Sequence, residues 1–296
     1  MTHPRSLPPE LDRAGFLVRD ATAAGVGANR LRRGDLLRPT HGVRTTDPSL
    51  PLVRAVGLVL RPDQHVSHTS ALAVWGAPLP RRAVGEPVHV STFGTGPLMR
   101  RRGVTGHRHR APVDTMVRDG VRVSAPAQAW RESVGLLTVH QAVAVADHFV
   151  RPGGLLTVDD LVTAIRPGSH GNAAAREVLG LVRVGADSAM ETWLRLAVVE
   201  AGFPEPQLQV EVSDARDVFL ARVDMAWPEH RIALEYDGAH HRERAAFEHD
   251  QRRDNGLAVN DWLVIHATRA DASRPAVLFE RLRQAFVVRR DARRVA

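Results

Sequence analysis

The chain has 296 residues, none of them cysteine, and 44% of them are hydrophobic. This length and composition are typical of a globular protein with two or three domains, and the absence of cysteine excludes disulfide bonds and thiolate metal sites. No apolar run reaches membrane-spanning length, and the first residues lack the apolar core of a signal peptide, so we expect a cytoplasmic protein with no membrane partner.

The whole chain has a net charge of +7, and its positive charge is concentrated in the first part. Residues 1–184 contain 24 arginines and 14 acidic residues, whereas residues 185–296 contain 16 arginines and 19 acidic residues, so the two parts carry +10 and −3. A basic region joined to an acidic one fits a protein that holds a polyanion and delivers it to a metal site. An arginine-rich codon bias is the alternative explanation.

Residues 9–46 are expected to form a small helical unit that ends in a hairpin. A first helix is predicted over 19–24 and a second over 30–33, with Asn29 as its N-cap because asparagine accepts hydrogen bonds from the first helical N–H groups. Residues 36–44 then predict a strand, a turn and a strand. Two helices followed by a small wing are the arrangement of a winged-helix domain.

The basic helix and the segment Leu36-Leu-Arg-Pro-Thr-His-Gly-Val43 resemble the N-terminal domain of AbiEi-type antitoxins, the DNA-binding partners in type IV toxin–antitoxin systems. The resemblance implies a DNA partner and makes a cognate toxin a candidate second partner. It also implies that four side chains face a DNA groove or phosphates, namely Asn29, Arg30, Arg32 and Arg33. A solvated basic helix face is the alternative interpretation.

Residues 51–135 continue this resemblance, and residues 121–184 predict connecting helices. A strand is expected at 87–91, and Ser124 is expected to cap the helix that follows it. Basic clusters flank a glycine-rich turn, and phosphate contact is the functional interpretation of their arginines, which are Arg100, Arg101, Arg102, Arg108 and Arg110.

Four histidines of the same region, His65, His68, His107 and His109, are candidate metal ligands. The sequence places neither cysteine nor an acidic residue beside them on a defined element. Histidines without such companions are more often structural or phosphate-facing, and that interpretation is favoured.

Acidic residues are dense between Arg222 and Gly238. Trp227-Pro228 marks a turn because proline cannot continue a central strand, so a strand is expected on either side, with Asp224 on the first and Glu235 on the second. Converging carboxylates repel each other unless a cation or a proton lies between them, and Mg²⁺ is the natural cation for a site made of oxygen ligands. A surface hairpin with solvated acids is the alternative.

The chain from Asp187 onward resembles the PD-(D/E)XK restriction-endonuclease-like fold, in particular a bacterial branch related to very-short-patch-repair (Vsr) endonucleases. The resemblance rests on the order of Met190-Glu191, Arg222-Val-Asp224, Glu235-Tyr-Asp-Gly238, His240 or His241, Asp250 with Arg253, and Asp261-Trp-Leu-Val-Ile265. It implies metal-dependent hydrolysis of DNA, with Mg²⁺ or Mn²⁺ held by Asp224 and Glu235 and helped by Glu191 and Asp237. It also implies His240 or His241 as general acid or base and Arg253 as a phosphate clamp.

One position departs from that family's pattern. The family name implies a lysine two residues after the second acid, where this chain has Asp237, and the chain contains no lysine at all. The pKa of an arginine is too high for it to deprotonate water, so the base must be a histidine or a carboxylate. The missing lysine also favours a second interpretation, a non-catalytic DNA-binding antitoxin or regulator with an inactive nuclease fold.

The expected fold class is α/β and multidomain. We place a winged-helix-like α+β domain at residues 1–60, an antitoxin-like α+β and helical region at 61–184, and a restriction-endonuclease-like domain with a mixed central sheet at 185–296. The expected function is that of a metal-dependent DNA endonuclease with a basic DNA-binding N-terminal region.

Overall fold

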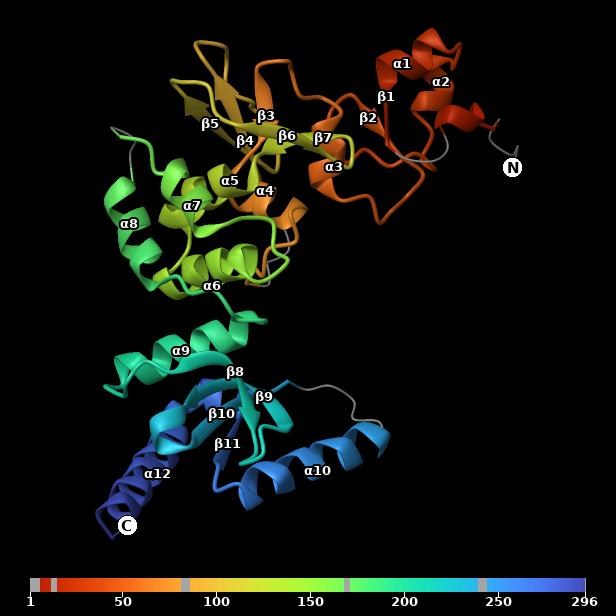
Figure 1. Cartoon of the computed structure of the whole chain (residues 1–296). Coiled ribbons are helices and arrows are strands. Elements are labelled where there is room, and N and C mark those ends of the chain that lie inside the picture. Colours follow the sequence, from red (N-terminus) through yellow and green to blue (C-terminus); the bar gives the residue numbers. More distant parts are fainter. Residues whose placement is uncertain (1–5, 12–14, 81–85, 168–170, 239–243, 296) are drawn as a thin grey trace. The chain divides into compact units, whose positions relative to one another are not determined.

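The computed structural model describes residues 6–11, 15–80, 86–167, 171–238 and 244–295 (Figure 1). The chain divides into two compact units, one formed by residues 1–138 and 156–177 and the other by residues 139–155 and 178–296. Both contain a sheet of mixed strand direction together with helices, so the protein is α/β as expected. Within the described ranges, no helix combines the length and the apolar character needed to cross a membrane.

The first unit begins with short elements gathered on a small apolar cluster. Strand β1 (Phe16–Leu17) pairs antiparallel with β2 (Val43–Arg44), and an isolated bridge joins Leu37 to Thr45. The helical elements here are η1 (Pro9–Leu11), α1 (Val18–Ala23) and α2 (Ala28–Leu31). The cluster that holds them together contains Leu7, Phe16, Ala21, Leu31 and Leu36.

A five-stranded sheet forms the rest of the first unit, in the order β5-β4-β3-β7-β6. Its strands are β3 (Gln64–Val66), β4 (Val88–Phe93), β5 (Val104–His109), β6 (Thr115–Arg118) and β7 (Val121–Ser124). Pairs β4–β5 and β3–β7 are parallel and the others are antiparallel. The helical elements are α3 (Leu52–Gly57), α4 (His68–Val74), α5 (Pro126–Ser133), η2 (Val134–Leu136) and α7 (Val158–Ala164), and α5 packs against both α4 and α7.

Two expected helix caps are wrong, and the reasons are local. Gly27 is the N-cap of α2, so the helix begins earlier than expected and Asn29 lies inside it. Helix α5 starts at Pro126 after an Ala125 N-cap, because Ser124 still belongs to β7 and its hydroxyl donates a hydrogen bond to Glu132 instead. Proline suits a first helical position because its missing N–H would be unpaired there.

The second unit is built on a four-stranded sheet in the order β11-β10-β9-β8. Its strands are β8 (Gln207–Ser213), β9 (Phe219–Trp227), β10 (Ile232–Asp237) and β11 (Leu263–Thr268). Strands β8, β9 and β10 form an antiparallel meander, and α10 (Arg244–Val259) carries the chain to β11, which lies parallel to β10. The other helical elements are α6 (Val139–Val150), α9 (Ala189–Glu200), η3 (Pro228–His230), α11 (Arg269–Ser273) and α12 (Pro275–Val295), and α8 (Asn172–Leu181) spans the division between the units.

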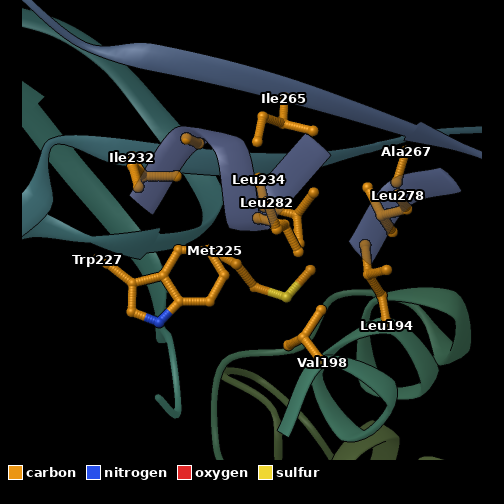
Figure 2. Packing of buried hydrophobic residues seen from close by; sticks show 11 residues of the cluster. Leu194, Val198, Met225, Trp227, Ile232, Leu234, Ile265, Ala267, Leu278 and Leu282 are labelled. Carbon is orange, nitrogen blue, oxygen red and sulfur yellow. The ribbon is translucent and has the colours of Figure 1, made fainter. Parts of the chain in front are cut away.

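Each face of this sheet packs against different helices. One face meets α9 and α12 through a core that includes Leu194, Met225, Leu234 and Leu282 (Figure 2). The other face contributes small and β-branched residues to a second cluster with Leu257 of α10. Because side chains alternate along a strand, Glu235 and Asp237 are expected on the α10 face, the face opposite Leu234.

Candidate active site

The acidic hairpin forms as the sequence predicts. The chain turns at η3, and Arg231 completes the turn in the left-handed region at φ 48°. The ladder between β9 and β10 pairs Ile232 with Trp227 and ends with Leu234 opposite Met225. The next residue on each strand is an acid, Glu235 on β10 and Asp224 on β9, so both acids stand where the paired part of the hairpin ends.

Asp224 is half-buried and is tied to the neighbouring strand. Its Oδ2 accepts a hydrogen bond from the backbone N–H of Tyr236 at 2.9 Å. Burial raises the pKa of Asp224, and the nearby Asp187 carboxylate adds to this, while the Tyr236 hydrogen bond and Arg253 oppose it. The ionised form of this side chain is therefore costly in the absence of a further cation.

Glu235 is only 5% exposed and uses its two oxygens differently. Its Oε2 contacts the Nη2 of Arg253 from α10, whereas its Oε1 is buried with no hydrogen-bond partner among the described residues. Burial raises the pKa of Glu235 and the charge of Asp224 raises it further, against the opposing effect of Arg253. An unpaired buried carboxylate oxygen is rare in native proteins and calls for a ligand or a proton.

Glu191 approaches the same acids from α9. It lies in the first turn of the helix, whose N-cap Ser188 accepts a hydrogen bond from the Glu191 backbone N–H. Its Oε2 accepts hydrogen bonds from the Asp187 N–H at 2.9 Å and from the Gln209 amide at 3.2 Å. Burial raises the pKa of Glu191, and the charge of Asp224 contributes to this, which places the two carboxylates within electrostatic reach of each other.

Asp237 takes part in a different set of contacts. Its Oδ2 lies 3.4 Å from Nδ1 of His266, and Nε2 of the same histidine lies 3.5 Å from an oxygen of Asp254. His266 is on β11 directly opposite Glu235, and Asp254 follows Arg253 on α10. The sequence analysis missed His266 and Asp254; the signal was the single polar residue inside the otherwise apolar strand Leu263–Thr268.

His240 and His241, the proposed general acid or base, lie outside the described residues, and the side chain of Asp250 does as well. Arg253 is described, and its contact is with Glu235 rather than with an open surface. The structure thus brings together Glu191, Asp224, Glu235 and Arg253 and adds the group Asp237, His266 and Asp254.

Asp224 and Glu235 are the residues at the end of the hairpin that could hold a divalent ion. Asp224 and Glu235 supply oxygen ligands, and the free Oε1 of Glu235 gives the ion a partner that the protein alone does not satisfy. Among the described residues, the groups of three donors that lie within 4.8 Å of one another are histidine clusters elsewhere in the chain, not these acids. A magnesium site does not require three clustered protein donors, because Mg²⁺ commonly keeps several waters and takes only one or two carboxylates.

The predicted DNA-contacting arginines have mixed environments. Asn29, Arg32 and Arg33 are exposed, whereas Arg30 is half-buried and forms two hydrogen bonds of 3.1 and 2.9 Å with Asp35. Arg101 donates to the His41 carbonyl at 2.6 Å, and Arg108 donates to the carbonyls of Gly94 and Gly96, so these two arginines hold loops. Arg100, Arg102 and Arg110 are exposed.

Several of these cations line a common groove within the first unit. The groove has a volume of about 1050 Å³, and its walls include Arg38, Arg44, Arg100, Arg101 and Arg102. Burial lowers the pKa of Arg44, and the charge of Arg38 lowers it further, which reports repulsion between neighbouring cations. Glu86 also lines the groove, but the five arginines outnumber it, so the walls are predominantly basic and attract negative charge.

Two proteins of Mycobacterium tuberculosis are similar to this chain. Uncharacterized protein MT2308 of strain CDC 1551 / Oshkosh and uncharacterized protein Rv2248 of strain ATCC 25618 / H37Rv are each 31% identical to it over 183 residues. The match covers 57% of this chain and 66% of each relative, just under two thirds of their length. No family model matches the chain, and no solved structure matches it. These names state no activity, so the function is argued from the geometry of the site.

Proposed function

We propose that this protein is a metal-dependent DNA endonuclease whose second unit hydrolyses phosphodiester bonds and whose basic first unit holds the DNA. The observation that carries the proposal is the pair Asp224 and Glu235 at the end of one hairpin. The charge of Asp224 raises the pKa of Glu235, and Oε1 of Glu235 is buried with no hydrogen-bond partner in the described part of the chain. A divalent cation would satisfy both conditions.

The topology of the second unit supports a restriction-endonuclease-like, Vsr-related core. An antiparallel meander is followed by a crossover helix and a parallel strand, and α9 precedes the sheet with Glu191 in its first turn. In this proposal Asp224 and Glu235 hold Mg²⁺ or Mn²⁺, and Glu191 and Asp237 contribute through water. When bound, the ion supplies positive charge to the scissile phosphate and lowers the pKa of its water.

Arg253 and His266 take the remaining roles. Arg253 neutralises Glu235 in the ligand-free protein and is positioned to exchange that carboxylate for a phosphate oxygen, which a guanidinium also binds well. His266 lies between Asp237 and Asp254, with its two ring nitrogens 3.4 and 3.5 Å from oxygens of these carboxylates. It therefore joins His240 and His241 as a candidate to accept a proton in a chain without lysine.

The first unit is proposed to supply DNA affinity. The groove lined by Arg38, Arg44, Arg100, Arg101 and Arg102 would follow a phosphate backbone. The short elements around α1 and α2, with exposed Asn29, Arg32 and Arg33, would act as a winged-helix-like contact. A cytoplasmic protein with a DNA partner is the setting that these features suit.

A second candidate function is favoured by the contacts that these acids already make within the protein. Asp224 is bonded by the Tyr236 N–H, Glu235 by Arg253, and Glu191 by the Asp187 N–H and Gln209. Together with the missing lysine, these contacts suit a non-catalytic DNA-binding antitoxin or regulator of the AbiEi type, with a toxin as a further partner.

One assay separates the two candidates. The purified chain is incubated with supercoiled plasmid and with single-stranded DNA in Mg²⁺, in Mn²⁺ and in EDTA. The nuclease proposal expects nicked, linear or shortened products with a metal and none in EDTA. Binding of DNA without cleavage in either metal supports the antitoxin-like function instead.

A further inference from the structure

Five histidines and one buried glutamate gather in the first unit. His65 lies on β3, His68 begins α4, His89 lies on β4, and His107 and His109 lie on β5. The register explains the gathering, because β4 pairs Ser91 with both His65 and His107. Alternate residues of β5 share one face, so His107 and His109 both point toward this cluster.

Three of these rings form a compact set of donors. One ring nitrogen from each of His68, His89 and His107 lies within 4.8 Å of the others, and all three residues are half-buried. Nδ1 of His89 and Nε2 of His107 are 2.7 Å apart, and the rings of His68 and His107 stack with their centres 3.9 Å apart. Burial lowers the pKa of His107 and lowers that of His68 to about 3.

Glu132 of α5 fixes the set in place. Its side chain is 1% exposed and accepts hydrogen bonds from the His68 backbone N–H, the Ser124 hydroxyl and the Gln128 amide, at 3.0, 2.8 and 2.9 Å. It also contacts Nε2 of His109 at 2.9 Å and Nδ1 of His68 at 4.0 Å. Glu132 is the acidic companion that the sequence could not place beside the histidines.

The backbone at His68 is held in an uncommon conformation. Its φ is +52°, in the left-handed region that residues other than glycine seldom occupy. Glu132 binds the N–H of this residue, and the Ser67 hydroxyl bonds its Nδ1 at 2.9 Å, which leaves Nε2 toward the other rings. Such strained conformations concentrate at functional sites.

The cluster opens into a pocket of the same unit. This pocket has a volume of about 820 Å³, and its walls include His68, His107, His109 and Glu132 together with Arg108 and Arg131. A site with three protein ligands and access to a pocket has the form of an open, reactive metal centre rather than a closed structural one.

We propose that His68, His89 and His107 bind a divalent transition-metal ion of the zinc class, with the fourth position open to this pocket. Two nitrogens on one tetrahedral zinc lie roughly 3.3 Å apart, because each Zn–N bond is about 2.0–2.1 Å. His89 and His107 must therefore separate slightly, and the ring that donates their shared hydrogen bond must carry its proton on its other nitrogen. Imidazole ligands select zinc-class ions over the oxygen-preferring Mg²⁺ of the acidic site.

The test uses the full chain without a histidine tag, stripped with EDTA and titrated with Co²⁺ and Zn²⁺ while the visible absorption of Co²⁺ is followed. One tightly bound ion per chain is expected. Affinity should fall by more than about 100-fold in His68→Ala, His89→Ala and His107→Ala, since even the loss of a ligand's hydrogen-bonding partner costs about 10- to 100-fold. His140→Ala, which removes a histidine paired with Glu200 in the second unit, should bind normally. Asp224→Asn should also bind normally, which separates this site from the nuclease proposal.

Two results would overturn the assignment. The first is a folded wild-type chain, checked by circular dichroism, that binds neither ion. The second is loss of binding in His65→Ala with retention in His107→Ala, which would place the ion at the other group of donors, His65, His109 and Glu132. If an alanine variant does not fold, the matching glutamine variant replaces it, because glutamine keeps a polar side chain of similar length.

Discussion

The carboxylate of Asp224 and the backbone N–H of Tyr236 are joined by a hydrogen bond of 2.9 Å that links β9 to β10 immediately beyond their ladder. This bond holds an ionisable group beside Glu235 in a half-buried position. An apolar residue there would cost less free energy on folding. A site that retains such charges stores unfavourable energy that a ligand can release.

Replacing Asp224 by asparagine should make the metal-free protein slightly more stable. Asparagine keeps an oxygen for the Tyr236 N–H but removes a buried charge next to Glu235 and Glu191. In EDTA, we expect the variant to melt at or a few degrees above the wild type, since about 1 kcal/mol shifts Tm by a few degrees. Millimolar Mg²⁺ should raise the Tm of the wild type only. A variant that melts far below the wild type in EDTA would contradict this view of the site.

Replacing Arg253 by alanine should leave Glu235 buried without its cation. A buried charged group that loses its hydrogen-bond partner costs about 1–3 kcal/mol, so the urea midpoint should fall. Mg²⁺ should restore more stability to this variant than to the wild type because the ion takes over the neutralisation of Glu235. Arg252→Ala, at the exposed neighbouring position, is the matched control and should change neither quantity. Equal effects of Mg²⁺ on both variants would argue against a cation at Glu235.

The ion pair between Asp147 on α6 and Arg195 on α9 should dominate the stability of the second unit. Their side chains are 0% and 2% exposed, and Thr192 and the Arg183 N–H also bond Asp147. Breaking such a pair costs about 3–5 kcal/mol, so Arg195→Met should lower the urea midpoint sharply. The double variant with Asp147→Leu should recover part of the loss. Arg283→Ala breaks an exposed pair with Glu280 and should cost at most about 1 kcal/mol. Equal losses for Arg283→Ala and Arg195→Met would contradict the assignment.

DNA affinity should depend on the groove of the first unit. Arg100→Ala with Arg102→Ala should reduce the slope of log affinity against log salt by about 1.8, since each phosphate contact contributes about 0.9. Fluorescence anisotropy with a labelled duplex at several salt concentrations measures this slope. Arg283→Ala removes an exposed arginine paired with Glu280 on α12 of the second unit and is the control. An unchanged slope in the double variant would exclude these arginines from the DNA contact.

Local sequence signals located the elements of the second unit well. Proline at residue 228 marked the turn, and a strand forms on either side of it as expected, with Asp224 on β9 and Glu235 on β10. These features depend on residues that are neighbours in the sequence, so they can be predicted without knowledge of the tertiary structure. The caps at Asn29 and Ser124 failed because a glycine and a proline nearby decided where each helix begins.

Contacts between distant segments could not be predicted in the same way. The His266 contacts with Asp237 and Asp254 require the parallel pairing of β10 with β11 and the position of α10. The histidine cluster forms because β3, β4 and β5 are adjacent in the sheet and α5 positions Glu132 beside it. Glu132 is far from His65 in the sequence, so the sequence alone does not indicate that the two lie close together. The domain assignment likewise placed α6 with the preceding residues, whereas the buried pair Asp147 and Arg195 connects it to α9.

The most direct test of the nuclease proposal compares plasmid cleavage by the wild type, Asp224→Asn and Glu229→Gln in Mg²⁺ and in Mn²⁺. Glu229 is an exposed acid in the turn at the opposite end of the same hairpin, so its variant controls for the loss of one negative charge. We predict cleavage by the wild type and by Glu229→Gln, and none by a folded Asp224→Asn variant. Cleavage by Asp224→Asn at the wild-type rate, or no cleavage by any of the three, would contradict the proposal.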